Sequence, residues 1–255
     1  MIIKNEFPIL EFDTDTNAII MPNHEGHNVK LPKKAVLAFL GDEIEKYAAA
    51  NNGVKVMDFI SITKLFPLFI VKYKGEDIAI IQAPVGASAS VQFLDWLSAY
   101  GVEEVISAGS CGVLVPMDEN VFLVPKRALR DEGASYHYAP PSRFIDVSDK
   151  ARRAIEKTLD EHNLKYIEVT TWTTDGFYRE TKDLVEYRVS EGCTVVEMEC
   201  SALAACAEMR GITWGQILYT GDTLADAERY DARSFGNDSM EYALRLCMDA
   251  VLNIE

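Results

Sequence analysis

The stretch from residue 194 to residue 222 constrains the fold more than any other part of the chain. An apolar run over 194–197 predicts a buried strand, and the small residues of 200–209 predict a helix that a glycine ends. A second apolar run over 213–220 predicts another strand, followed directly by Gly221 and Asp222. We therefore predict a β-α-β crossover with acidic residues at the carboxyl ends of two neighbouring strands.

Three carboxylates of this stretch are candidates for a site. Ligands of open parallel sheets bind outside the carboxyl ends of the strands, so Glu197, Glu199 and Asp222 are expected to meet at one rim. Two alternatives stay open. The glutamates would serve solubility if they faced solvent, and Asp222 would be an ordinary N-cap of the segment that follows it. The presence of both acidic groups favours a site.

Length and charge limit the classes of function. The 255 residues, 48% of them hydrophobic, are enough for one large core. Forty acidic against 25 basic residues give a formal charge of −15, which disfavours nucleic-acid polymers and anionic membranes as partners. A small anionic ligand stays open where local N–H donors outweigh this charge.

Cysteine usage and the N-terminal sequence indicate the compartment. The five cysteines have no CxxC spacing, so we predict reduced, buried thiols and no metal site or other cofactor. No apolar run reaches the length of a membrane span, and the first residues lack the regions of a signal peptide. We therefore predict a cytoplasmic protein.

The chain divides into an arm and one domain. Residues 1–34 lack periodicity and are expected to form an N-terminal arm over the body or a neighbouring subunit, or a loosely packed extension. Strands then alternate with helices over 35–255, which predicts one α/β domain without repeats. Its first strand, 35–40, ends at Gly41, where backbone N–H groups face an anion in many proteins.

Two further stretches carry candidate groups. A strand over 105–108 leads into Gly109-Ser110-Cys111-Gly112, which we interpret either as a ligand-binding turn or as a simple tight turn. The polar segment 126–143 is predicted as a functional loop that carries Arg130, Tyr136 and His137. A later turn presents Phe177, either as a core residue or as a ring that stacks on a ligand.

With these motifs placed, the chain resembles the nucleoside phosphorylase family, which contains bacterial purine nucleoside phosphorylases, uridine phosphorylases and related nucleosidases. The resemblance rests on GSCG at 109–112, the aromatic turn at Phe177 and the runs VEMEC and GD that end at Cys200 and Asp222. It covers Ala35 to the C-terminal helix. It implies a single-domain, three-layer α/β fold with a mixed central sheet flanked by helices, in a homodimer or a trimer of dimers.

The resemblance also implies roles for individual residues. Glu199 would accept hydrogen bonds from both ribose hydroxyls, and Met198, beside Glu197, would pack on the sugar. Phe177 would stack on the base. Asp222 would neutralise the charge that develops on a departing purine. Uridine phosphorylases read their base through a Gln/Arg pair, where this chain has Thr181 and Asp183, so the resemblance favours a purine.

The nucleophile is the point where the resemblance weakens. Gly41, Ser110 and Arg130 would surround phosphate as co-substrate, yet Glu45 and Ser107 stand where the phosphorylases have arginine. Phosphorolysis to free base and ribose 1-phosphate, with other cations substituting, is the favoured prediction. The candidates for those cations are Lys33, Lys34, Arg127 and Arg130, acting within the chain or across a subunit boundary.

Two alternatives to phosphorolysis stay open. One is hydrolysis by water, with Glu43, Glu45 or Glu197 as general base. The other is a protein that binds nucleosides without cleaving them. His24 and His27 are expected to be solvated loop residues, with contact to a neighbour's substrate as the alternative.

Overall fold

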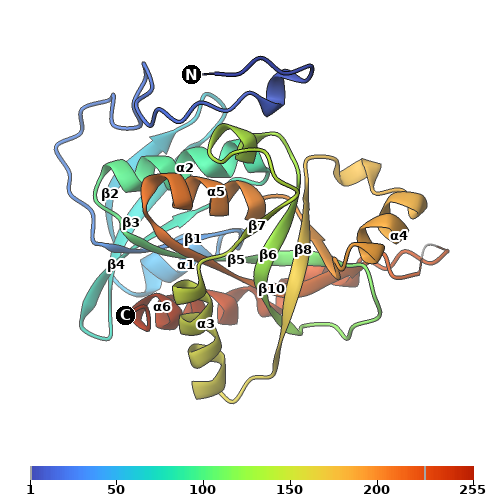
Figure 1. The fold of residues 1–255 in the computed structure, drawn as a ribbon. Coiled ribbons are helices and arrows are strands. Elements are labelled where there is room, and N and C mark those ends of the chain that lie inside the picture. The colour runs from blue at the N-terminus through green and yellow to red at the C-terminus, as the bar shows by residue number, and fades with distance from the viewer. Residues whose placement is uncertain (1, 227) are drawn as a thin grey trace.

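The structure is a computed structural model that describes residues 2–226 and 228–255 (Figure 1). The strands are β1 (Lys34–Ala38), β2 (Val54–Ile60), β3 (Leu65–Tyr73), β4 (Glu76–Gln82), β5 (Glu104–Val113), β6 (Phe122–Asp131), β7 (Phe144–Asp146), β8 (Tyr166–Thr174), β9 (Val195–Glu197) and β10 (Thr213–Thr223). The α-helices are α1 (Glu43–Ala50), α2 (Ala87–Ala99), α3 (Asp149–Glu161), α4 (Lys182–Ser190), α5 (Cys200–Arg210) and α6 (Met240–Leu252).

All ten strands belong to one mixed sheet, in the order β10-β6-β8-β9-β5-β1-β4-β3-β2, with β7 beside β6. Because β10 also pairs with β5, strands β10, β6, β8, β9 and β5 close into a ring. Closure pairs backbone groups that an open sheet would leave at its edges. The predicted mixed central sheet is confirmed.

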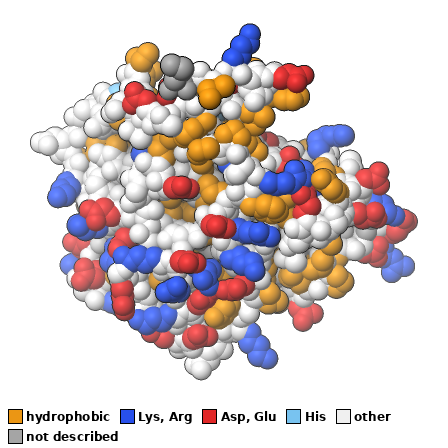
Figure 2. Space-filling view, in the orientation of Figure 1, with side chains coloured by type: hydrophobic (Ala, Val, Ile, Leu, Met, Phe, Trp, Pro, Cys, Tyr) orange, Lys and Arg blue, Asp and Glu red, His pale blue; other side chains and the backbone are white. Residues whose placement is uncertain are grey.

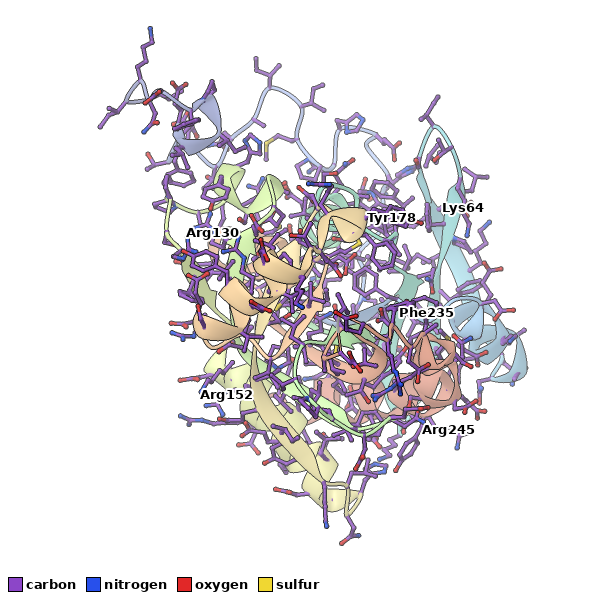
Figure 3. All side chains as sticks on the ribbon, turned by 90° about the vertical axis from the view of Figure 1, so that its right-hand side faces the viewer. Lys64, Arg130, Arg152, Tyr178, Phe235 and Arg245 are labelled. Carbon is purple, nitrogen blue, oxygen red and sulfur yellow. The ribbon has the colours of Figure 1, made fainter. Side chains whose placement is uncertain are left out.

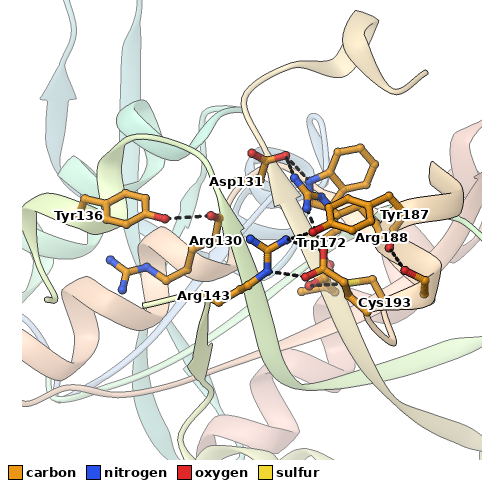
Figure 4. Close-up of polar contacts among 11 residues, drawn as sticks. Arg130, Asp131, Tyr136, Arg143, Trp172, Tyr187, Arg188 and Cys193 are labelled. Atoms are coloured by element: carbon orange, nitrogen blue, oxygen red, sulfur yellow. Dashed lines mark hydrogen bonds and ion pairs between the residues drawn. The ribbon is translucent and has the colours of Figure 1, made fainter. Parts of the chain in front are cut away.

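Helices cover both sides of this sheet, which gives the three predicted layers (Figure 1). Buried side chains of α2 and α5 form a core on one side, and those of α1, α3 and α6 form a core on the other. Burial of these apolar surfaces is the main stabilising contribution to the fold. Helix α4 packs at the side of the ring, where Arg188 donates to Asp131 Oδ2 at 2.9 Å (Figure 4).

The predicted strand, helix and second strand are confirmed as β9, α5 and β10, but their predicted parallel crossover is wrong. Strand β10 runs parallel to β5, but β9 pairs with β5 in the antiparallel direction, at Gly112↔Val196 and Val113↔Val195. Strand β9 is only three residues long and crosses the carboxyl end of β5. Its direction is set by this pairing and by its parallel pairing with β8.

Other elements also differ from the prediction. The 109–112 segment is not a turn, because β5 continues through it to Val113 with partners on both sides. Part of the predicted 126–143 loop is strand, since β6 extends to Asp131 and β7 follows it. Strand β2 and helix α4 were not predicted.

The N-terminal segment contains one short 3-10 helix, Pro8–Leu10, before β1 begins. It runs across the top of the view, above α2 (Figure 1). Arg210 of α5 donates to the carbonyl oxygen of Thr16 at 2.8 Å, and the Leu31 N–H donates to the Tyr100 carbonyl at 2.9 Å. The segment is therefore held against the body by contacts with the α2–α5 layer.

The surface is charged but not segregated. Acidic and basic side chains intermingle across the face in Figure 2, with apolar patches between them. Within residues 2–226 and 228–255, no helix has the length and apolar character that crossing a bilayer requires.

Candidate active site

A cavity of about 180 Å³ lies where β9 meets α5, beside the carboxyl ends of β5 and β10. Four of its lining side chains are acids: Glu180, Glu197, Glu199 and Asp222. Ser110 and Gly109 of β5 line it as well. The structure thus places Glu199 and Asp222 on a single cavity, as the predicted rim required, although by a different strand arrangement.

The carboxyl end of β5 brings the two acids together. Gly112 pairs with β9 on one side, and the next residue, Val113, pairs with Thr223 of β10 on the other. A Cβ at Gly112 would lie 3.2 Å from Asp222 Oδ1 and 2.9 Å from Leu224 Cδ1. Glycine is therefore needed here for close packing of β10, which carries Asp222, and β9, which leads to Glu199.

Glu197 anchors the start of α5. Its Oε1 accepts hydrogen bonds from the hydroxyls of Thr171 at 3.1 Å and Thr173 at 2.6 Å. Its Oε2 accepts from the N–H groups of Glu199 at 2.8 Å and Cys200 at 2.6 Å. Burial raises the pKa of this carboxyl, and the four bonds act against the rise. With every oxygen lone pair engaged, Glu197 positions its neighbours rather than accepting a proton from water.

Glu199 is the N-cap residue of α5 and only 6% exposed. Its Oε1 accepts a hydrogen bond from the Gly86 N–H at 2.6 Å, which joins the starts of α2 and α5. Burial, followed by the charge of Glu197, raises the pKa of Glu199 to about 8. Ionisation of Glu199 in the folded protein therefore costs free energy.

This cost gives a prediction about stability. An acid whose pKa rises from 4.5 to about 8 on folding stabilises the fold fully below pH 4.5, and the contribution declines as pH rises toward 8. Gln cannot ionise but keeps the acceptor for Gly86. We expect the melting temperature of Glu199→Gln, relative to that of the wild type, to rise as the pH increases from 5 to 8.

Thermal melts across this pH range measure the effect. Glu208→Gln, which changes an exposed acid on the same helix, is the control and is expected to follow the wild type. A constant difference between Glu199→Gln and the wild type at all pH values would contradict the assignment.

Asp222 and Glu180 are the other two acids that line the cavity. Asp222 is 6% exposed; burial raises its pKa, and the Tyr230 hydroxyl acts against the rise. Burial and the charge of Asp222 raise the pKa of Glu180 to about 7. The pKa of about 7 lets Glu180 hold a proton near neutral pH, and burial shifts the pKa of Asp222 in the same direction, so the pair is suited to sharing one proton that a ligand can receive.

Glu180 was missed by the sequence analysis. It lies three residues after Phe177, in the same turn, and that proximity was the available signal. Phe39, Val85 and Phe235 also line the cavity and were not predicted. They come from separate segments that only the folded chain brings together.

The apolar part of the lining is suited to a flat ring and a sugar. Phe177 and Met198, which were predicted to contact a ligand, line the cavity together with Phe235 from the segment before α6. Phe177 is 42% exposed and Val85 is 70% exposed. Figure 3 labels Phe235 and Tyr178, the residue after Phe177, on the same side of the view. Aromatic faces and a thioether pack well against heterocycles and sugars.

Arg130 does not reach this cavity. Its guanidinium donates to Ser135 Oγ at 2.9 Å, to Ser142 Oγ at 2.8 Å and to the carbonyls of Ala139 and Pro140. It also stacks on Tyr136, and Figure 3 shows it well to the left of Phe235. The Tyr136 hydroxyl donates in turn to the Arg130 carbonyl (Figure 4). Arg130 therefore stabilises its own segment, 130–142. Its predicted place beside the nucleophile is wrong for the cavity of the same chain.

Gly41 and Glu45 are also absent from the lining. Gly41 adopts a left-handed backbone with φ of 58° between β1 and α1, and Glu45 is exposed on α1. The structure does not bring either residue to the cavity of the same chain.

The lining has no basic side chain among residues 2–226 and 228–255. Lys33 pairs with Glu103, Lys34 pairs with Glu104, and Arg127 stacks on Phe144. Ser107, where phosphorylases of the resembled family have an arginine, is fully buried and accepts a hydrogen bond from Trp214 Nε1 at 3.0 Å. None of the four proposed substitute cations therefore reaches the cavity of its own chain.

Larger hollows lie elsewhere, and two of similar volume contain paired charged groups. One of about 810 Å³ lies under the N-terminal segment, and its buried acid Asp95 is paired with Arg210. The other, of about 830 Å³, contains Arg152, which pairs with three acids of its surroundings. Neither gathers buried, unpaired acids as the smaller cavity does. In the described part of the chain, no group of three or more His, Cys, Asp and Glu side chains is placed to hold a metal ion.

Comparison with known proteins gives consistent matches. Residues 33–252 match the family model described as the phosphorylase superfamily. A guanosine phosphorylase of Halorubrum lacusprofundi is 24% identical over 205 residues, covering 76% of this chain and 83% of the relative. A DeoD-type purine nucleoside phosphorylase of Bacillus cereus is 29% identical over 189 residues, covering 68% and 76%. The AMP nucleosidase structure from Bacteroides thetaiotaomicron superimposes with a TM-score of 0.71 at 22% identity, covering 87% and 88%.

Proposed function

This chain belongs to the phosphorylase superfamily, and we propose that it cleaves the N-glycosidic bond of a purine ribonucleoside with water as the nucleophile. The products are the free base and ribose. The relatives named above are purine-acting by their names, which supports the choice of base. The choice of water departs from the phosphorolysis that the sequence favoured.

The charge of the cavity carries this choice. Four carboxyl groups line about 180 Å³ of space, and the described lining has no Lys, Arg or His. Phosphate enters near neutral pH with one to two negative charges and needs cationic donors for compensation. Water carries no charge and is not repelled. The acid group therefore supports hydrolysis within a single chain.

The lining residues have distinct roles in this reaction. The vicinal ribose hydroxyls donate hydrogen bonds to Glu199, which favours its ionised form in the complex, and Met198 packs against the sugar. Phe177 and Phe235 hold the base. Protonated Asp222 donates to the purine ring as negative charge develops on it, which lowers the barrier to departure of the base. Glu180, whose pKa is about 7, is the second carboxyl group that can hold a proton next to the base.

Phosphorolysis is the second candidate, because the curated relatives named above are phosphorylases. It requires cationic groups from a second copy of the chain, since Lys33, Lys34, Arg127 and Arg130 are engaged elsewhere in their own chain. The family resemblance implies a homo-oligomer, in which a neighbouring subunit would supply these cationic groups.

Product analysis distinguishes the two candidates. We expect inosine, guanosine or adenosine to yield free base and ribose at the same rate with and without phosphate, and uridine to react more slowly. Ribose 1-phosphate formed only when phosphate is added would contradict hydrolysis and support the second candidate. Binding without release of any base would leave a nucleoside-binding protein and overturn both.

A further inference from the structure

Gln216 is the buried polar side chain of the cavity that no role above explains. It lies in the middle of β10, is 1% exposed and lines the cavity. Its Oε1 is buried and has no hydrogen-bond partner among the described residues. A buried amide oxygen without a partner is unfavourable, so such a group in a cavity points to a ligand that supplies the missing donor.

The neighbouring strand explains why Gln216 is open to the cavity. Gln216 pairs in register with Ser107 of β5, and Leu218 pairs with Gly109. Side chains two residues apart in a strand share a face, so the position above Ser107 on this face is Gly109, which has no side chain. A Cβ there would lie 3.3 Å from Phe39 Cβ. The glycine therefore lets Phe39 pack closely against β5, and Phe39, Gly109 and Gln216 line the same cavity.

The Ser107 hydroxyl, on the strand paired with β10, does not donate to Gln216 Oε1. Ser107 accepts from Trp214 Nε1 at 3.0 Å. Gln216 is therefore a neutral group in the lining, where a cation would be needed to hold phosphate. An amide oxygen accepts a hydrogen bond from water and repels a phosphate oxygen.

We propose that Gln216 holds the attacking water in the cavity and so positions the nucleophile. The water donates one hydrogen to Gln216 Oε1 and directs its oxygen lone pair at the anomeric carbon. This inference rests on the proposed hydrolysis and names the group that orients its nucleophile.

The reaction balances without another reactant. The water oxygen forms a bond to C1′ while the C1′–N9 electron pair leaves with the base. The Asp222 carboxyl gives its proton to the base, and the proton released by the attacking water returns Asp222 to its acid form through exchange with solvent. The products are ribose and neutral base. Gln216 is unchanged throughout, as expected of a positioning residue.

Gln216→Met tests the proposal, because methionine has the same length and lacks the amide. We expect kcat for purine release to fall by about 10- to 100-fold, since misplacing a reactant costs this much, with KM unchanged. Gln216→Glu, which restores an oxygen acceptor, is expected to recover part of the lost rate. Gln82→Met is the matched control: Gln82 Oε1 also lacks a partner, but it lies in β4 outside the cavity.

Methanol supplies a readout that a merely structural role would not change. In water with added methanol, the anomeric carbon is captured by either nucleophile, and the ratio of methyl riboside to ribose reports on the selection of water. We expect this ratio to rise in Gln216→Met and to stay at the wild-type value in Gln82→Met.

The outcomes separate this inference from the proposed function. Wild-type hydrolysis with an unchanged kcat and an unchanged ratio in Gln216→Met would overturn the role of Gln216 and leave hydrolysis intact. Absence of hydrolysis by the wild type would overturn both. If Gln216→Met does not fold, Gln216→Leu and Gln216→Glu are compared for the same ratio, and equality with the wild type in a folded variant contradicts the role.

Discussion

Asp222→Asn is expected to release purine base at least about 100-fold more slowly than the wild type, because asparagine offers no proton to the departing ring. The amide has nearly the shape of the carboxyl, so packing against Gly112 is kept. Burial raises the pKa of Asp222, which favours the protonated form that this role needs. Steady-state kinetics with inosine or guanosine measure the effect, and we expect it in kcat.

A substrate whose leaving group needs no proton provides the internal control. The nitrophenyl riboside loses a stable phenolate, so Asp222→Asn is expected to cleave it at close to the wild-type rate. Asp226→Asn, at an exposed position four residues later, is expected to cleave purine nucleosides normally. An equal loss on both substrates would show that Asp222 acts on the sugar or on stability, and an unchanged purine rate would remove it from the mechanism.

Glu199→Gln is expected to lower kcat/KM for ribosides by about 10- to 100-fold, the effect of losing hydrogen bonds to a charged acceptor. The loss should be smaller for 2′-deoxyribosides, which lack one of the two hydroxyls that the carboxylate binds. The bond from the Gly86 N–H can still form with the glutamine oxygen, so α5 keeps its start.

Comparison of inosine with 2′-deoxyinosine in both proteins measures this difference. Glu208→Gln, the exposed variant on the same helix, is the control and is expected to leave both substrates unaffected. Equal losses on riboside and deoxyriboside would contradict the role in holding the diol.

The sequence was sufficient to predict the family, the mixed α/β fold and the two acids that the structure places on one cavity. It predicted their meeting for the wrong reason. A parallel crossover was expected, whereas β9 runs antiparallel to β5 and crosses its end at Gly112. A three-residue strand has too little pattern to indicate its direction, which long-range pairing decides.

Local composition misled the prediction at two places. The glycines of 109–112 favoured a turn, yet β9 and β10 pair with this segment on both sides and keep it extended. The polar composition of 126–143 suggested a loop, but a register shift between Pro125 and Arg127 lets β6 continue past the proline. In both cases tertiary pairing outweighs local preference.

The missed lining residues share a physical cause. Glu180, Gln216 and Phe235 come from a turn, the middle of a strand and an irregular segment. Nothing in their neighbours distinguishes them from surface, core and loop residues. Only the closed ring of strands brings them to Asp222. Conversely, Arg130 had the chemistry of a phosphate ligand, but four acceptors in its own segment engage it.

The central claim is that these acids cleave a purine nucleoside with water. Its most direct test is the reaction of inosine in ¹⁸O-labelled water at saturating phosphate, with the sugar product analysed by mass spectrometry. The account predicts free ribose carrying one ¹⁸O atom at the anomeric position, even with phosphate in excess. Unlabelled ribose 1-phosphate as the product would contradict it.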